Sequence, residues 1–192
     1  LLEKAIKDRI AKTGKKPKAI IPVHLYGMPA KIDEICAIAE KYEIPVLEDA
    51  AEALGSEFNG RKCGTFGTFG ALSFNGNKMI TTSGGGALVV ADEAAKKQTM
   101  YYATQAREAY PYYQHEKIGY NYRMPNINAA LGCAQLEHLD EFVASKRKVA
   151  QEYADFFKDI PDIDFFEEPE DSYSNYWLNV VIMKDKAAQY KF

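Results

Sequence analysis

The fold is decided by residues 73–86, which read Ser-Phe-Asn-Gly-Asn-Lys-Met-Ile-Thr-Thr-Ser-Gly-Gly-Gly. In this stretch Lys78 stands between the end of a short apolar run, residues 71–74, and a cluster of three glycines. Glycines let the backbone turn tightly and pass close to a flat ligand. Residues 71–74 and 86–90 are typical of short strands, so Lys78 is predicted to lie in the turn between them.

Upstream of this turn, residues 44–51 (Ile-Pro-Val-Leu-Glu-Asp-Ala-Ala) are typical of a strand that ends on the carboxylate of Asp49. Residues 18–25 resemble another buried strand, and residues 31–43 place apolar side chains at helical spacing. A strand, a helix and a strand in this order predict parallel strands with a right-handed crossover. Parallel sheets bind ligands at the C-terminal ends of their strands, so Asp49 is expected at a site.

A lysine and a carboxylate in such a crevice suit pyridoxal 5'-phosphate chemistry. The amine of Lys78 could form a Schiff base and then act as general base, while Asp49 could keep the pyridine nitrogen protonated. Ser73 could bind the phosphate beside free N–H groups of the turn. Glu52 follows Asp49 by three residues and could face the same cavity. Each residue alone also has a plainer interpretation, as a surface lysine, a capping Asp, a strand serine or a helix-start Glu.

The segment from residue 110 to about 125 is predicted to be a loop rich in tyrosine. Asn121 and Arg123 within it offer an amide and a guanidinium group for anions, although such loops are also common in subunit interfaces. His24 and His115 are expected to be core or loop residues, since neither has a nearby Ser or Cys that would suggest a triad. The glycine patterns do not match a dinucleotide-binding fingerprint.

Elsewhere the sequence predicts helices over residues 2–14 and 93–106, and a long helix, straight or bent, from near 128 to about 157. Residues 176–183 are predicted to form a strand. We expect a domain boundary within the long helix. It would separate residues 1–135, part of a large cofactor-binding domain, from residues 136–192, a linking helix and a partial C-terminal domain.

The composition favours a packed globular protein. The 192 residues are 47% hydrophobic with a net charge of −3, and no stretch concentrates basic residues, so nucleic acid is not an expected partner. No apolar run approaches the ~20 residues of a membrane span. Three widely spaced cysteines, Cys36, Cys63 and Cys133, give no metal-ligand or disulfide pattern, which favours a reducing cytoplasm.

Four segments together resemble the DegT/DnrJ/EryC1/StrS family of pyridoxal-phosphate-dependent sugar aminotransferases. They are residues 24–27 (His-Leu-Tyr-Gly), 48–55 (Glu-Asp-Ala-Ala-Glu-Ala-Leu-Gly), 73–86, and 119–126 (Gly-Tyr-Asn-Tyr-Arg-Met-Pro-Asn). The resemblance implies an α/β protein of fold-type I, the aspartate aminotransferase-like class. This fold has a large domain with a mainly parallel sheet, followed here by the start of a small α+β domain. It also implies a homodimer with active sites at the interface.

The resemblance implies a role for each candidate residue. Lys78 would be the Schiff-base lysine, Asp49 the partner of the pyridine nitrogen, and Ser73 a phosphate ligand. Asn121 would reach the phosphate in the neighbouring subunit's site. Glu52 falls where the family often has Gln or His beside the cofactor ring.

The implied reaction moves an amino group from glutamate to a keto group of a nucleotide-linked sugar. The form Phe-Asn-Gly-Asn-Lys is similar to members that aminate UDP-4-keto-6-deoxy sugars for surface glycans. A dehydratase branch replaces the lysine with His, and Lys78 argues against it. The family also has an upstream phosphate-binding turn and more of the small domain, so this chain is expected to be an internal fragment. The alternatives are a relative that binds the cofactor or sugar nucleotide without turnover, and a structural α/β domain.

Overall fold

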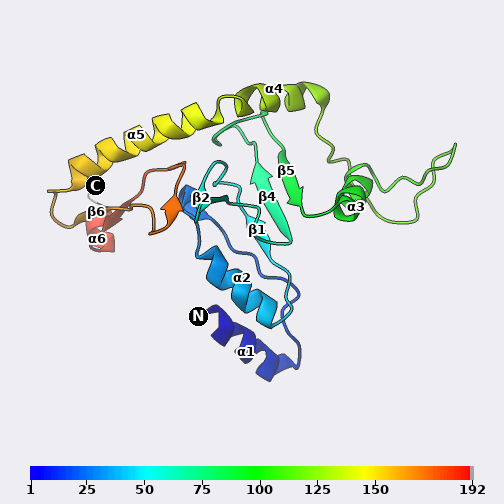
Figure 1. The fold of residues 1–192 in the computed structure, drawn as a ribbon, viewed down its shortest axis with the longest axis horizontal. Helices are drawn as coiled ribbons and strands as arrows, with labels where there is room; N and C mark the ends of the chain where they lie inside the picture. The colour runs from blue at the N-terminus through cyan, green and yellow to red at the C-terminus, as the bar shows by residue number, and fades with distance from the viewer. Residues whose placement is uncertain (191–192) are drawn as a thin grey trace.

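The computed structural model describes residues 1–190, and its centre is a three-stranded sheet in the order β1-β4-β5 (Figure 1). Strand β1 (Leu47–Asp49) lies parallel to β4 (Phe69–Ser73), with Asp49 opposite Ala71. Strand β5 (Gly86–Val90) is antiparallel to β4 and places Gly86 opposite Ser73. The turn that carries Lys78 therefore joins two neighbouring strands, as the sequence predicted.

The predicted strand over residues 18–25 is present only as two parallel bridges, from Ile20 to Val46 and from Val23 to Asp49. The parallel pairing is as expected, but a continuous buried strand is wrong. Pro22 has no N–H to extend the ladder, and the side chains of Ile21 and Val23 are 60% and 46% exposed. The segment then enters a short 3-10 helix, η1 (Leu25–Gly27).

Two of the predicted helices lie below the sheet in Figure 1. Helix α1 (Leu2–Thr13) ends at Gly14 in the left-handed conformation, and α2 (Ile32–Lys41) precedes β1. They pack together with the edge of the sheet, and burial of apolar side chains stabilises this contact. The core of this part consists of Ile6, Ile20, Ile32, Ala39, Ile44, Val46 and Phe58.

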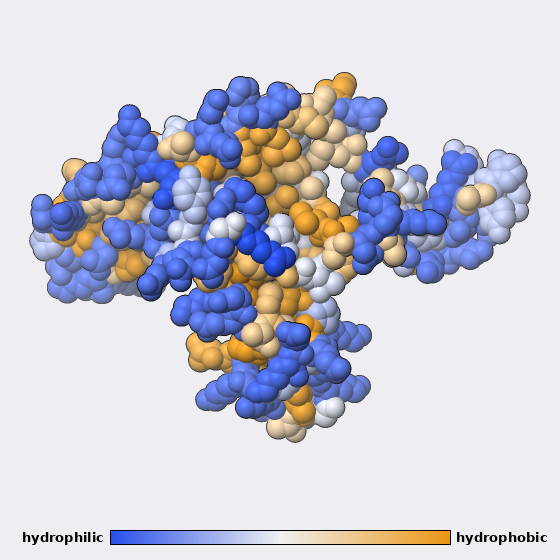
Figure 2. Space-filling view, in the orientation of Figure 1, coloured by the Kyte–Doolittle hydropathy of each residue, from blue (hydrophilic) through white to orange (hydrophobic). Residues whose placement is uncertain are grey.

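The predicted long helix is two helices, α4 (Asn126–Leu136) and α5 (Leu139–Phe157), which run along the top of the molecule in Figure 1. Figure 2 shows apolar side chains on the surface of α4, where Ile127 is 86% exposed. Helix α3 (Glu93–Ala103) and the coil that follows it project away from the sheet as an arm. No helix among residues 1–190 combines the length and the hydropathy that crossing a bilayer requires.

The C-terminal part forms two small sheets and a short helix. Strand β6 (Ile163–Phe165) pairs with β8 (Val181–Met183), and α6 (Lys186–Gln189) follows. Strand β7 (Ser172–Tyr173) joins β2 (Glu57–Phe58), which also pairs with β3 (Arg61–Lys62). The predicted strand over residues 176–183 is wrong for its first half, because Tyr176 has φ of 44°, which extended backbone does not allow. The domain boundary near residue 135 stays a prediction.

Candidate active site

The turn after β4 holds Lys78 through its own backbone. The N–H of Phe74 donates to the carbonyl of Gly85 at 2.9 Å, and the N–H of Thr82 donates to the carbonyl of Phe74 at 2.9 Å. Within this closed loop the N–H of Lys78 donates to the carbonyl of Asn75 at 3.1 Å. These bonds fix the backbone from which the lysine side chain extends.

Helix α4 fixes the same turn from outside. The side chain of Gln135 donates to the carbonyl of Thr81 at 2.6 Å and accepts from its N–H at 3.0 Å. The amide of Asn128 donates to the carbonyl of Thr82 at 2.6 Å. Helix and turn approach closely because Gly132 has no side chain: a Cβ there would lie 2.9 Å from a methyl of Thr82. These supporting residues could not be predicted from the sequence, since they lie about fifty positions away from the turn.

The amine of Lys78 lies between two side chains from distant parts of the chain. Its Nζ is 3.8 Å from Oε1 of Glu52 and 4.2 Å from the centroid of the Trp177 ring, and the lysine side chain is 14% exposed. The other carboxylate oxygen of Glu52 accepts the backbone N–H of Tyr26 at 2.6 Å. Glu52 is therefore held toward the amine by a second partner.

Asp49 and Ser73 share one face of the sheet. Asp49 lies opposite Ala71, and Ser73 follows Ala71 by two positions, so both side chains point to the same side. Each side chain also makes a local hydrogen bond of the kind expected of a capping Asp or a strand serine. Asp49 accepts the N–H of Ala51 at 3.2 Å, and the Ser73 hydroxyl accepts the N–H of Asn75 at 3.4 Å. A carboxylate and a hydroxyl both retain further bonding capacity for a ligand.

Asn121 stands apart from the other candidate residues. It lies on the projecting arm, where it forms an antiparallel bridge with Thr104, and it is exposed. Among the described residues no hydrogen bond joins it to Asp49, Glu52 or Lys78. The structure thus brings Lys78 and Glu52 together, puts Asp49 and Ser73 on one sheet face, and leaves Asn121 outside.

A buried carboxylate that the sequence analysis did not single out lies beside Asp49. Glu48 is fully buried and accepts four hydrogens: from the N–H groups of Phe66 and Gly67 at 2.5 and 2.6 Å, from the N–H of Gly64 at 2.8 Å, and from His24 at 3.1 Å. These bonds tie the loop of residues 64–67 to β1. The available signal was an acidic residue at a strand position where an apolar side chain would be expected.

The hydrogen on His24 can be assigned from its partners. The N–H of Ala30 donates to Nδ1 at 3.0 Å, so Nε2 carries the hydrogen and donates it to Glu48. Burial raises the pKa of Glu48, but the hydrogen bonds from His24, Gly67 and Gly64 outweigh it and hold the pKa below its ordinary value. His24 is thus a core residue with satisfied hydrogen bonds, as predicted, and Glu48 is a structural anion.

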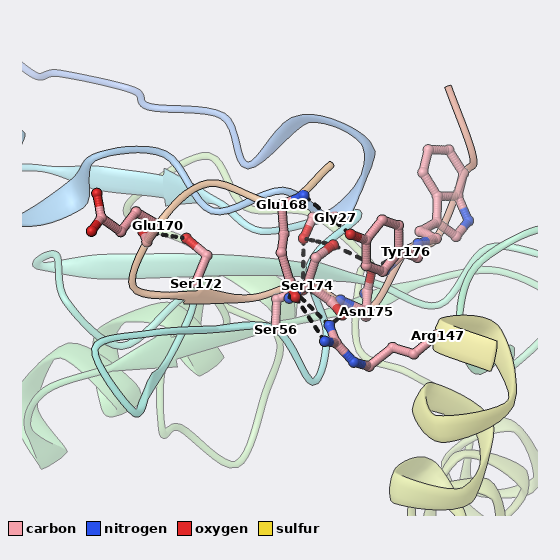
Figure 3. A network of polar contacts seen from close by, with 10 residues as sticks. Gly27, Ser56, Arg147, Glu168, Glu170, Ser172, Ser174, Asn175 and Tyr176 are labelled. Atoms are coloured by element: carbon pink, nitrogen blue, oxygen red, sulfur yellow. Dashed lines mark hydrogen bonds and ion pairs between the residues drawn. The ribbon is translucent and has the colours of Figure 1, made fainter. Parts of the chain in front are cut away.

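An ion pair anchors the segment after β6 to α5 (Figure 3). Arg147 donates from two nitrogens to the two carboxylate oxygens of Glu168, both at 2.7 Å, and also to the carbonyl of Ser174 at 2.7 Å. Burial raises the pKa of Glu168, but Arg147 and the N–H of Ser174 outweigh it and lower the pKa. Bidentate geometry of this kind fixes orientation as well as distance.

Asn175 connects this anchored segment to the site. It is fully buried, and its amide donates to the carbonyls of Glu52 and Leu54, both at 2.9 Å. Its own N–H donates to the Ser56 hydroxyl at 2.9 Å, and its side-chain oxygen accepts the N–H of Trp177 at 2.8 Å (Figure 3). One side chain therefore holds both Glu52 and Trp177, the two partners of the Lys78 amine.

These features define a class of protein. An amine on a closed turn, next to parallel strands whose C-terminal ends carry a carboxylate and a hydroxyl, is typical of α/β enzymes that hold pyridoxal phosphate on a lysine. The chain belongs to the DegT/DnrJ/EryC1/StrS aminotransferase family, whose model matches residues 1–191. The resemblance seen in the sequence is confirmed.

Two named proteins are similar to this chain over nearly its whole length. It is 46% identical over 189 residues to EpsN of Bacillus subtilis (strain 168), which is named as a pyridoxal phosphate-dependent aminotransferase; the match covers 98% of this chain and 48% of EpsN. It is 37% identical over 180 residues to GDP-perosamine synthase of Escherichia coli O157:H7, covering 94% of this chain and 49% of that protein.

Solved structures agree with the fold. A DegT DnrJ EryC1 StrS aminotransferase from Brucella abortus matches with a TM-score of 0.88 and 29% identity, over 97% of this chain and 50% of that one. The predicted fold-type I architecture is therefore confirmed. The chain spans about half the length of the relatives it matches.

Proposed function

We propose that the protein containing this chain is an aminotransferase that uses pyridoxal 5'-phosphate to move an amino group from glutamate to a keto group of a nucleotide-linked sugar. The observation that carries the proposal is the Lys78 amine, which extends from a closed turn on a side chain that is only 14% exposed. Membership of the family and the names of its relatives support the same conclusion.

The donor set on this chain fits the cofactor. Pyridoxal phosphate supplies an aldehyde that condenses with amines and a protonated ring that accepts electrons from the substrate carbon. Lys78 provides the amine that would hold it. Asp49, at the end of β1, would keep the ring nitrogen protonated. Ser73, on the same sheet face, would donate a hydrogen bond from its hydroxyl to the phosphate. Glu52 would lie beside the ring and the lysine.

A homodimer with shared sites would give Asn121 its role. Asn121 lies on the projecting arm and is exposed, together with aromatic side chains such as Tyr113 and Tyr122, both 78% exposed. Aromatic residues are enriched in subunit interfaces. On a second subunit this arm could carry Asn121 to a neighbouring phosphate.

We expect the enzyme to work in the cytoplasm.

The narrower substrate expectation is a UDP-4-keto-6-deoxy sugar used for surface glycans. One relative is named for a GDP-linked sugar, so the nucleotide has to be decided by assay. Intact protein would be offered UDP- and GDP-linked 4-keto-6-deoxy sugars with glutamate, and the amino sugar would be identified by mass spectrometry. A product from the UDP substrate alone supports the narrower expectation, and a product from the GDP substrate alone contradicts it.

The proposal is tested on the intact protein with pyridoxal phosphate. We expect a visible absorption band that is absent in Lys78→Ala and present in the control Lys31→Ala, whose side chain is 76% exposed. Glutamate should bleach the band, and the keto sugar should restore it. No band in the intact protein would refute the proposal. A band that glutamate does not change would instead indicate a cofactor-binding protein without turnover.

A further inference from the structure

Trp177 is the sole tryptophan of the 192-residue sequence, and it lies against the lysine of the site. The centroid of its ring is 4.2 Å from Nζ of Lys78, and the side chain is 8% exposed. Indole is the strongest aromatic partner for an ammonium group, and removal from water strengthens the attraction. The ring therefore attracts the amine whenever the amine carries a positive charge.

The same side chain also fixes the backbone of the turn. The indole N–H donates to the carbonyl of Asn77 at 2.7 Å, directly before Lys78 in the chain. Trp177 thus contacts the lysine at both ends, at the peptide that carries it and at the amine. Ordinary core packing requires neither contact, although the ring also packs against Met79 and Val143.

Trp177 is itself oriented by the site. Its backbone N–H donates to Oδ1 of Asn175 at 2.8 Å, and the amide of Asn175 donates to the carbonyl of Glu52 at 2.9 Å. Glu52 is the second partner of the amine, at 3.8 Å. The π face and the carboxylate are therefore held in a fixed relation through one buried asparagine.

We propose that Trp177 is a positioning residue for Lys78, an inference that rests on the proposed function. Its ring and the Glu52 carboxylate hold the free lysine amine in place, and they stabilise its positive charge when the amine accepts a proton as general base. The hydrogen bond from the indole N–H to the carbonyl of Asn77 keeps the backbone of the turn in place. Trp177 does not react; it acts through Lys78.

Kinetics of the intact enzyme test this role with two variants and a matched control. In Trp177→Leu we expect kcat to fall about tenfold, within the range of a desolvated cation–π contact, with KM for glutamate changed less than about twofold. Trp177→Phe keeps a ring and loses the indole N–H, so about a threefold fall is expected. The control is Tyr173→Leu, on the same segment, whose ring lies 4.0 Å from the guanidinium of Arg147 and not on the lysine. It should keep the wild-type kcat.

Fluorescence provides a readout that does not depend on turnover. The emission of Trp177, taken as the difference between the wild type and Trp177→Phe, should be strongly quenched when pyridoxal phosphate is captured, because the ring is in contact distance of the attachment point. If circular dichroism shows that Trp177→Leu does not fold, the fluorescence measurement and the kinetics of Trp177→Phe still test the positioning role.

The outcomes separate the two proposals. If the wild type captures no cofactor, the proposed function fails and this inference with it. If the wild type captures cofactor but Trp177 emission is unchanged, or both Trp177 variants keep the wild-type kcat, the positioning role alone is overturned. An equal fall of kcat in Tyr173→Leu would also overturn it, since the effect would then belong to docking of the segment.

Discussion

Replacing Glu48 by Gln tests the buried network that holds β1 beside the site. The carboxylate accepts four hydrogens, whereas a Gln carbonyl accepts two and its NH₂ group accepts none. If the Gln carbonyl keeps the hydrogen bonds from the N–H groups of Phe66 and Gly67, its NH₂ group takes the place of the other carboxylate oxygen. The N–H of Gly64 and the Nε2–H of His24 then point at this NH₂ group and have no acceptor. His24 cannot escape by changing tautomer, because Ala30 would then lose its acceptor.

The expected cost follows from two unsatisfied buried donors. Each costs about 1–3 kcal/mol, and local relaxation recovers part of it, so we expect Glu48→Gln to lower the free energy of unfolding by about 2–4 kcal/mol at pH 7. Proteins of this kind have about 5–15 kcal/mol in total, so the variant should fold with a clearly lower midpoint.

The pH dependence has a definite sign. The folded-state pKa of Glu48 is lowered from its ordinary value of 4.5, because hydrogen bonds outweigh the opposing effect of burial. Its contribution is therefore fully present above pH 4.5 and is lost as the pH falls through the folded-state pKa. Gln does not titrate, so the difference between wild type and variant should shrink on the acid side.

Urea unfolding of the intact protein, followed by circular dichroism at a series of pH values, measures both effects. The matched control is Glu93→Gln, at a side chain that is 83% exposed and pairs with Lys96; a surface pair of this kind contributes less than about 1 kcal/mol. A difference for Glu48→Gln below about 0.5 kcal/mol at pH 7, or one that does not shrink in acid, would refute the reasoning.

Two further predictions concern a close approach and a buried thiol. Gly27 has a φ of 87°, and in Gly27→Ala the new Cβ would overlap the side-chain oxygen of Asn175, so thermal unfolding should show the free energy of unfolding lowered by at least about 3 kcal/mol. The control Gly14→Ala has a φ of 66° and open space around it, so its free energy of unfolding should fall by only about 1 kcal/mol. Burial raises the pKa of Cys63 to about 12, so at pH 8 a thiol reagent should label exposed Cys133 and reach Cys63 only after unfolding. Labelling of both at equal rates in the folded protein would contradict this.

The sequence could predict what depends on neighbours in the chain. Helices α1 and α2 follow from apolar spacing, and the turn around Lys78 follows from the glycines after it. The parallel pairing of residues 20–23 with residues 46–49 follows from the crossover rule. The assignment of the lysine itself came from the joint resemblance of four segments, since in isolation a lysine in a turn is ordinary.

Long-range polar bonds set what the sequence could not predict. Residues 176–180 have the composition of a strand, yet the N–H groups of Tyr176 and Trp177 donate to the side chains of Ser174 and Asn175 and hold this segment in another shape. Tyr176 takes a positive φ as a result. Glu48 has the sequence context of an ordinary strand residue. Its burial could not be predicted, because its four hydrogen-bond donors come from segments that no local pattern locates. Trp177 was hidden in the same apolar run, since its partner Lys78 lies on a remote turn.

This dependence bears on how the site works. If the predicted boundary near residue 135 holds, Glu52 and Lys78 belong to the first domain and Trp177 to the second. The second part is docked on the first through Ser174 and Asn175, whose side chains donate to the backbone carbonyls of Gly27 and Glu52. A shift of this docked segment would move the indole face away from the amine while leaving Glu52 in place, held by Tyr26. The position of the Lys78 amine would then depend on where the C-terminal segment lies, so contacts remote from the amine could move it without touching it.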